Sequence, residues 1–426
     1  MLTQVAWRNV WRSKVRSLVV ITAISLGLIA GIFLMSFSWG MNTQRTRDII
    51  ETRTSHIQIH QKHYKDDRKM SLFIPQGMKL LDEVKTEPEV KATTARILAN
   101  GMISNARGGF GVQINGIIPE EEAKVTKLDT RVVAGEYFEG LKTNPILIGD
   151  KLAEKMGWKE IPEPGAKNED GSPAQPTYQI RKKVVLAFQA PGGKTKYGSF
   201  KVVGVYKSIN SKFDESNVFV QFEDLNRLTG TENQAHEIAI MLNDQNMAED
   251  STFLASLAAG NSQLLVENWK DISPDLKLID ETFAITVYIF MGIILLALLF
   301  GIVNTMLMAV MERTKELGML MAIGMNKDKI FSMIMLETIF LSTIGGPIGL
   351  LLGYGLVRLF GNIGIDLSSM AEAGAQMGIG TMVYTDLETH YYFQIALMVV
   401  VTALIAAIYP AYKALQLKPV EAIRSI

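Results

Sequence analysis

Four long apolar stretches interrupt an otherwise polar chain. They cover residues 17–44, 282–311, 330–357 and 391–412, and the first two contain no charged residue. A helix needs about 20 apolar residues to cross the hydrocarbon core of a bilayer, which is roughly 30 Å thick. The pattern therefore predicts four transmembrane helices, at 17–44, 281–311, 330–357 and 391–412. A cleaved signal peptide is the alternative for the first stretch, but its length and its bulky C-terminal part favour an uncleaved anchor.

The second and third stretches carry features beyond hydropathy. Residues 282–311 would extend about 45 Å as a helix, so this helix is expected to tilt or to project from the membrane. The third stretch contains one charge, Glu337, and a Gly345-Gly346-Pro347 break of a kind that packed neighbours tolerate. An intramembrane carboxylate is a candidate functional group, although Glu337 is near enough to the end of its span to pair with a basic residue there.

Charged residues differ between the two sides of the predicted spans. Short flanks rich in Lys and Arg stay in the cytoplasm, so the segments 1–16, 312–329 and 413–426 are expected there. The large segment 45–280 and the acidic loop 358–390 are then extracytoplasmic. The basic flanking residues are Arg8, Arg12, Lys14, Arg16, Arg313, Lys315, Lys327, Lys329, Lys413, Lys418 and Arg424, and the acidic loop residues are Asp366, Glu372, Asp386 and Glu388.

The N-terminal segment 1–16 has the pattern of an amphipathic helix. Arg8, Arg12 and Arg16 are four residues apart and form one stripe, and Trp7 and Trp11 form a neighbouring stripe. Basic and aromatic stripes together favour a helix that lies on the inner membrane surface. A plain topology signal is the simpler interpretation, and the two are compatible.

Residues 45–280 are too many for a connecting loop and predict a folded α+β domain. Strands are expected at 56–60, 183–188, 200–206 and 217–222, where apolar residues alternate or β-branched residues gather. Short helices are expected at 80–84, 150–156 and 222–228. The proline-rich segment 161–176 predicts an irregular insertion. The fold class is thus an α-helical membrane protein with four transmembrane helices and a large extracytoplasmic α+β domain.

Composition removes several classes of function. The chain of 426 residues has a formal net charge of zero and no cysteine. Neutrality argues against nucleic acid as a partner, because phosphate binding needs a basic surplus. The absence of cysteine excludes disulfides, thiolate metal sites and cysteine nucleophiles.

Two further patterns are interpreted as structural. Gly193-Lys194-Thr195 lacks the glycine that a nucleotide-binding P-loop needs, because that position is Phe188, so a polar turn is expected. His56 and His60 share a face of a strand but would lie about 13 Å apart, which is too far for one metal ion. We therefore expect no metal site, no catalytic residue and no cofactor in this chain.

The segment 311–331 (MERTKELGMLMAIGMNKDKIF) predicts a short amphipathic helix suited to docking a cytoplasmic partner. It resembles the coupling region of the FtsX/MacB-type ABC transporter permeases. The C-terminal segment YPAYKALQLKPVEAIR resembles the closing motif of the same family, and the N-terminal AWRNVWRSKVRS resembles its start. Matching coupling residues are Glu312, Arg313, Thr314, Glu316, Leu317, Gly318, Leu320, Ala322, Ile323 and Gly324, and the C-terminal matches include Pro410, Pro419, Glu421 and Arg424.

The resemblance implies a MacB-like periplasmic core and a permease subunit that does not itself hydrolyse ATP. ATP and Mg would be bound by a dimer of separate cytoplasmic ATP-binding subunits. A second permease, either the same chain or a paralogue, would complete the transporter in a bacterial inner membrane. Movement of the ATP-binding subunits would push on the helix 312–324, and the long second span would carry that movement outward.

Within the family, ETRTSHIQIHQKHY and KSINSKFDESNVFVQFEDLNRL resemble the lipoprotein-releasing (Lol-type) permeases. This implies extraction of lipoproteins from the inner membrane, with membrane lipid and a periplasmic chaperone as further partners. Candidate residues for an acyl-chain cavity are Met35, Phe37, Phe290 and Met291, although ordinary packing explains them equally well.

The chaperone-contacting hairpin of those permeases corresponds here to residues 189–199, with Pro191, Gly192, Lys194 and Tyr197, and this segment is short. Alternatives are an exporter of amphipathic small molecules or peptides, an envelope regulator, or a receptor or scaffold without an ATPase.

Overall fold

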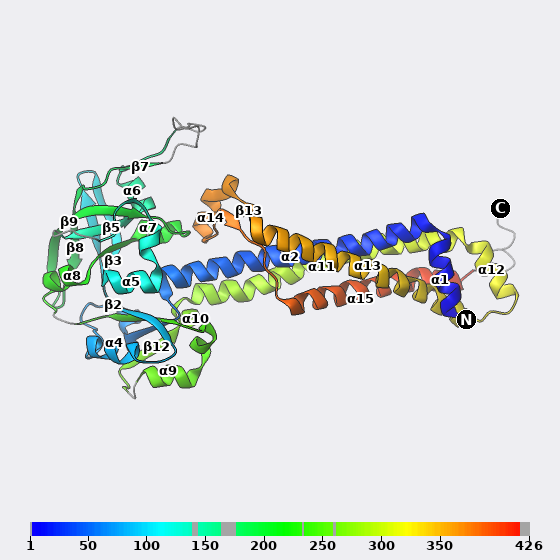
Figure 1. Ribbon diagram of the computed structural model, residues 1–426, viewed down its shortest axis with the longest axis horizontal. Coiled ribbons are helices and arrows are strands. Elements are labelled where there is room, and N and C mark those ends of the chain that lie inside the picture. The colour runs from blue at the N-terminus through cyan, green and yellow to red at the C-terminus, as the bar shows by residue number, and fades with distance from the viewer. Residues whose placement is uncertain (1, 139–143, 163–175, 232–233, 259–260, 418–426) are drawn as a thin grey trace. The chain divides into compact units, whose positions relative to one another are not determined.

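The computed structural model describes residues 2–138, 144–162, 176–231, 234–258 and 261–417. The chain divides into two compact units, which are shown in Figure 1. The helical unit comprises Met1–Thr43, Ile279–Ser369 and Met382–Ile426. The α+β domain comprises Gln44–Leu278 together with Met370–Thr381. Both main boundaries fall inside long continuous helices.

Within the described residues, four helices are long and apolar enough to cross a membrane, at Lys14–Thr54, Ile285–Glu312, Lys327–Ile363 and Thr389–Leu415. The first, third and fourth of these helices extend past their predicted stretches at both ends. The second begins inside its predicted stretch and ends beyond it. Hydropathy marks the apolar part of a helix rather than its ends. The long helices are α2 (Lys14–Ile49, followed by the π-helical turn η1, Ile50–Thr54), α11 (Pro274–Glu312), α13 (Lys327–Ile363) and α15 (Thr389–Leu415).

Shorter elements complete the helical unit, and they differ from the prediction in two places. The N-terminal helix ends at Arg12, and Arg16 belongs to α2, so the predicted stripe of three arginines is divided between two helices. The predicted loop 358–390 begins inside α13 and contains a small two-stranded sheet. The elements are α1 (Leu2–Arg12), α12 (Thr314–Ala322), β13 (Ile365–Asp366), η4 (Ser368–Met370), β14 (Met382–Val383) and, within the α+β domain, α14 (Ala371–Met377).

Glycines let α13 pack closely on α2. An added Cβ at Gly349 would lie 2.8 Å from the Cβ of Leu28 and 3.0 Å from the Cα of Ser25. Gly345 and Gly353 face α2 in the same way, and Ser25 donates a hydrogen bond to the carbonyl oxygen of Gly345 at 2.9 Å. Stripes of small residues at four-residue spacing allow this approach of two backbones. The prediction that one span tolerates Gly345, Gly346 and Pro347 is confirmed, since α13 runs through them without interruption.

The α+β domain contains a ten-stranded sheet in the order β12-β1-β11-β2-β3-β10-β5-β9-β4, with β8 paired to both β2 and β9. Its strands are β1 (Ile57–Gln61), β2 (Val90–Asn105), β3 (Gly108–Ile117), β4 (Val132–Gly135), β5 (Pro145–Gly149), β8 (Lys183–Gln189), β9 (Thr195–Tyr206), β10 (Asn217–Gln221), β11 (Glu237–Leu242) and β12 (Leu264–Asn268). A separate pair is β6 (Lys159–Glu160) with β7 (Thr177–Tyr178).

Helices and turns connect these strands. The predicted strands and short helices are all present, and their ends lie within five residues of the predicted ends. The connecting helices and turns are α3 (Tyr64–Asp67), α4 (Gly77–Lys85), α5 (Pro119–Thr126), η2 (Leu128–Arg131), α6 (Asp150–Lys155), α7 (Ser211–Ser216), α8 (Phe222–Thr229), η3 (Gln245–Glu249), α9 (Ser251–Leu257) and α10 (Trp269–Ile272). Most of the predicted insertion 161–176 lies outside the described residues.

The part of the large sheet around β1, β11 and β2 has one apolar and one polar face. Ile57 and Ile59 of β1 join a core with Ile97, Ile114 and residues of α4 and α8. Successive side chains of a strand point to opposite faces, so the residues between these apolar ones share the other face. Across β1, β11 and β2, His60 pairs with Glu237 and Glu237 pairs with Arg96. At these strands this face is lined by charged and amide side chains, whereas at β5 and β10 it carries a second apolar cluster that includes Leu147 and Phe219.

Replacement of Gly349 tests the contact between α2 and α13. We expect Gly349→Val to lower the thermal midpoint of the full chain in detergent, because overpacking a fitted interface costs about 1–3 kcal/mol. Gly355→Val is the matched control, since no atom lies within 4 Å of an added Cβ there. Equal midpoints for the two variants, at one heating rate, would contradict the packing described here.

Candidate functional site

The break between α11 and α12 sets the geometry of the candidate site. α11 ends at Glu312, Arg313 leaves helical geometry at φ −99° and ψ 16°, and α12 begins at Thr314. The predicted single helix from Glu312 to Gly324 is therefore two elements. α12 ends where Gly324 adopts φ +100° and the amide of Met325 bonds back to the carbonyl of Leu320 at 3.0 Å. Glycine suits this left-handed helix end because it has no Cβ.

Arg313, Glu337 and Asn9 form a polar contact between three helices. The Arg313 Nη1 atom lies 3.0 Å and 3.3 Å from the two carboxylate oxygens of Glu337. Asn9 donates from Nδ2 to Glu337 Oε1 at 2.7 Å, and its backbone carbonyl accepts from Arg313 Nη2 at 2.9 Å. The side chains of Arg313 and Glu337 are only 14% and 12% exposed. We call this set the three-helix polar contact.

Two more exposed ion pairs join the same elements. Arg12 of α1 pairs with Glu316 of α12 at 2.5 Å, and Arg16 of α2 pairs with Glu312 at the end of α11. Ion pairs at a surface contribute little to stability, with typical values of about 1 kcal/mol or less. The three-helix polar contact therefore carries most of the electrostatic connection here.

The two faces of α12 have different roles. Leu317 and Gly318 are buried, and Leu317 packs with residues of α1, α11 and α13. Lys315, Met319, Ala322 and Ile323 recur at helical spacing and are exposed, and the side chains of Met319 and Ile323 are 54% and 79% exposed. We call these four residues the outward stripe of α12. Exposed apolar side chains that gather on one face of a short helix are typical of a surface that binds another protein.

A cavity of about 340 Å³ lies between these elements. Its wall includes Asn9, Arg313, Glu316, Leu317 and Glu337, together with residues from the end of α11. The space beside the buried face of α12 leaves room for this helix to shift. The three-helix polar contact would move with it, because Arg313 directly precedes α12.

The predicted coupling residues thus divide into several groups. Glu312, Arg313 and Glu316 are held in ion pairs within the chain, and Thr314 donates to the carbonyl of Met311 at 2.7 Å. Leu317, Gly318 and Leu320 are packing residues, and Gly324 ends the helix. Ala322 and Ile323 lie on the outward stripe.

Other predicted site residues do not join this region. Pro410 is buried inside α15, whereas Pro419, Glu421 and Arg424 lie outside the described residues. Met35 and Met291 are buried together in the core of the helical unit, which is the packing interpretation. Phe37 stacks on Phe33, and Phe290 is exposed. The acyl-chain role of these residues stays a prediction.

The segment 189–199 forms the turn and flanks of the β8–β9 hairpin. Gly192 and Gly193 adopt positive φ, and the amide of Ala190 bonds to the carbonyl of Lys194 at 2.9 Å. Lys194 and Tyr197 are exposed and Pro191 is partly buried. The polar turn expected from Gly193-Lys194-Thr195 is confirmed, whereas contact with a chaperone stays a prediction.

Sequence reasoning missed Asn9 and Met319. Asn9 is separated from Glu337 by 328 positions, so no local pattern relates the two residues. The exposure of Met319 had a local signal, since Lys315, Met319 and Ala322 share one face of a nine-residue helix. Among the residues that the structure describes, no group of three His, Asp or Glu side chains has the geometry of a metal site.

Removing one member of the buried ion pair tests the three-helix polar contact. We expect Arg313→Gln to lower stability by about 3 kcal/mol or more, because Glu337 is left buried with an uncompensated charge. Adding Glu337→Gln to this variant should recover part of the lost stability. Stability is measured as the thermal midpoint of the purified chain. Arg12→Gln is the control at an exposed pair, and a loss as small as that of this control would refute the assignment.

Comparison with known proteins assigns the two parts of the chain. Residues 17–252 match the MacB-like periplasmic core domain, and residues 288–419 match the FtsX-like permease C-terminal family. An uncharacterized ABC transporter permease from Methanocaldococcus jannaschii is 21% identical over 98% of this chain and 96% of its own length.

Two relatives with named roles are similarly distant. The pyoverdine export ATP-binding/permease protein of Pseudomonas savastanoi pv. phaseolicola is 25% identical over 99% of this chain but only 59% of its own length. The lipoprotein-releasing system transmembrane protein LolC of Neisseria meningitidis is 24% identical over 81% of this chain and 80% of its own length. Because the periplasmic core match alone covers more than half of the residues, the chain belongs to this family and is an ABC transporter permease of the MacB/FtsX type.

Proposed function

We propose that this chain is the non-catalytic permease subunit of a transporter driven by separate ATP-binding subunits, and that these subunits dock on the outward stripe of α12. The observation that carries the proposal is the position of Met319 and Ile323, which are exposed on a short helix whose opposite face is packed. Apolar anchors with charged neighbours are the composition expected of a protein interface.

The charge distribution supports a cytoplasmic location for this stripe. The basic residues Arg8, Lys315 and Lys327 are exposed around α1 and α12, whereas Asp366 and Glu388 are exposed beyond the opposite ends of α13 and α15. The positive-inside rule then puts both termini in the cytoplasm and the α+β domain outside it. We place the protein in the cytoplasmic membrane with a second permease, which is either another copy or a paralogue.

Mechanical transmission is the proposed mechanism. α11 is continuous from Pro274 to Glu312, so it would be about 58 Å long at 1.5 Å per residue, well beyond a hydrocarbon core of roughly 30 Å. Movement of α12 would act through Arg313 on Glu337 and Asn9, and hence on α13 and α1. The continuous helices α11 and α2 would carry that movement toward the α+β domain.

For the substrate, we propose a lipoprotein that is drawn from the membrane. The relative from Neisseria meningitidis, named for lipoprotein release, supports this choice, since the match covers about four fifths of both chains. Export of an amphipathic small molecule is the second candidate, and the pyoverdine exporter supports it over nearly the whole of this chain. Both substrates would use the same coupling site.

Polar substitutions on the outward stripe test the docking proposal. The tagged full chain is purified from its native membrane, and the copurifying ATP hydrolysis is measured. We expect Met319→Ser with Ile323→Ser to reduce this activity at least about tenfold, because the apolar anchors of an interface carry most of its binding energy. Ile363→Ser is the matched control, since Ile363 is also exposed but ends α13 away from α12. Undiminished activity in the double variant would argue against docking there.

Depletion of the chain separates the two substrates. If the substrate is a lipoprotein, depleted cells should retain lipoproteins in the inner membrane, and the fractionated membranes can be compared by mass spectrometry. Normal lipoprotein distribution, together with intracellular accumulation of an amphipathic small molecule, would instead select the exporter.

A further inference from the structure

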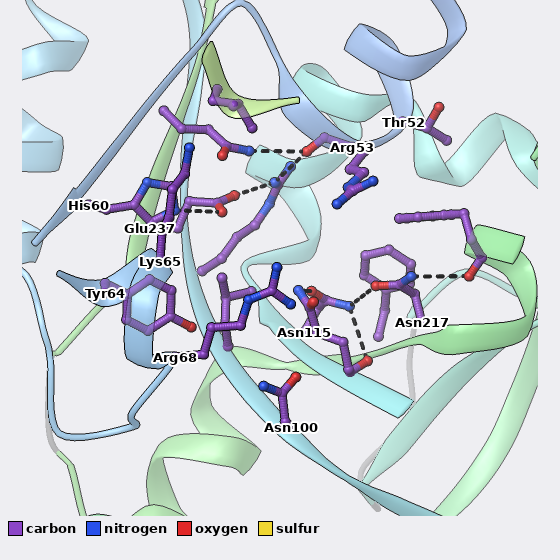
Figure 2. A pocket seen from close by; sticks show the side chains of 17 residues that line it. Thr52, Arg53, His60, Tyr64, Lys65, Arg68, Asn100, Asn115, Asn217 and Glu237 are labelled. Atoms are coloured by element: carbon purple, nitrogen blue, oxygen red, sulfur yellow. Dashed lines mark hydrogen bonds and ion pairs between the residues drawn. The ribbon is translucent and has the colours of Figure 1, made fainter. Parts of the chain in front are cut away.

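A polar cavity of about 150 Å³ lies against the polar face of the large sheet in the α+β domain (Figure 2). Strands β1, β2, β3, β10 and β11 provide its floor, and η1, α3 and α7 contribute its walls. This volume has room for several water molecules or for one small organic molecule. Permease coupling, as proposed above, makes no use of this cavity.

The floor of the cavity is fixed by a buried ionic network. Arg96 binds Glu122 at 2.7 Å and Glu237 at 2.5 Å, and His60 Nε2 lies 3.1 Å from Glu237. All four side chains are nearly fully buried. Burial raises the pKa of Glu237, but the charge of Arg96 and the hydrogen bond from His60 outweigh it and lower the pKa to about 2. The charge of Arg96 is therefore already balanced, and its guanidinium is a fixed part of the floor.

Arg53 and Arg68 also line the cavity. The backbone carbonyl of Arg53 accepts hydrogen bonds from Arg96 at 3.1 Å and from Gln58 at 3.3 Å, which fixes the point from which its side chain extends. In Figure 2 the Arg68 side chain extends toward Asn115. Within the described part of the chain, the Arg68 guanidinium forms no ion pair, whereas Lys65 is paired with Glu267 at 2.6 Å. Glu237 is the one carboxylate among the described residues that line the cavity, and it is already engaged.

Amide groups line the other side of the cavity. Asn115 is held by hydrogen bonds to Asn217 at 3.2 Å and to the carbonyl of Val218 at 3.1 Å. Asn100 is exposed at the rim. The Nδ1 atom of His60 is buried and lacks a hydrogen-bond partner among the described residues, although its ring lines the cavity. An unpaired buried polar atom is costly, so a molecule in the cavity that supplies this partner would be favoured.

We propose that this cavity binds a small organic anion, with its carboxylate or phosphate group held by Arg68 and its polar body against the amides and His60. Guanidinium groups bind such oxyanions through paired, charge-assisted hydrogen bonds. Amides and an aromatic ring beside them are suited to hydroxyl groups and short carbon chains. The site would give the α+β domain a ligand of its own, separate from the coupling site.

Binding to the purified full chain in neutral detergent tests this proposal. Calorimetric titrations use inorganic phosphate, glycerol 3-phosphate and malate as probes, at concentrations up to about 10 mM. We expect at least one probe to bind and Arg68→Gln to weaken it about tenfold, since one charge-assisted contact is lost. Asn100→Asp should weaken it as well by bringing a carboxylate to the rim. Arg181→Gln, at an exposed arginine of the same domain outside the cavity, should bind as the unmodified chain does.

Two results would overturn the proposal: no binding of any probe, or equal binding by the Arg68→Gln and Arg181→Gln variants. Repeating the titration in nanodiscs that contain phosphatidylglycerol distinguishes the source of the anion. Competition by these nanodiscs would indicate a lipid headgroup, and its absence a soluble anion. No ATP-binding subunit is needed for these measurements, so their outcome is independent of the docking proposal.

Discussion

A carboxylate inside an apolar helix needs a partner, and much of the helical unit follows from how Glu337 obtains one. Arg313 supplies the opposite charge and Asn9 a further hydrogen bond, so three helices meet at one point. Arg313 occupies the break between α11 and α12, which places the start of α12 beside α13. The same contact that satisfies a buried charge therefore also fixes the helix on which we propose that the ATP-binding subunits act.

The two units use polar groups in related ways. In the helical unit, a few buried polar side chains join helices that otherwise pack through glycine and apolar residues. In the α+β domain, Arg96, Glu237 and His60 of neighbouring strands form a network with Glu122 of α5. The apolar core lies on the opposite face of these strands. In both arrangements the buried charged side chains have partners of opposite charge, and a cavity lies beside them. The cavity of the helical unit leaves room for α12 to move. The cavity of the α+β domain leaves room for the ligand that we propose.

Much of the fold could be predicted because its signals are local. The four long helices follow from hydropathy, and β1 follows from the alternation of isoleucine with polar residues. Long-range relations were out of reach. The contact of Asn9 with Glu337 joins distant segments, and the fit of Gly349 against Leu28 depends on how two helices cross. The polar cavity could not be predicted for the same reason. The sequence of each strand shows which of its residues share a face, but not which strands become neighbours in the sheet. The family was predicted correctly, yet the residues of the predicted coupling motif divide between packing, ion pairing and an exposed stripe that only the structure separates.

In the proposed mechanism, movement at α12 reaches the α+β domain. The chain contains no cysteine, so a single pair of spin labels can be introduced at Lys327→Cys in α13 and Lys183→Cys in β8. Pulsed electron paramagnetic resonance on the assembled transporter then measures the distance between the two labels with and without ATP. We expect an ATP-dependent change in that distance, which disappears when Arg313→Gln is added. A distance that stays the same while ATP is hydrolysed would rule out transmission from α12 to the α+β domain.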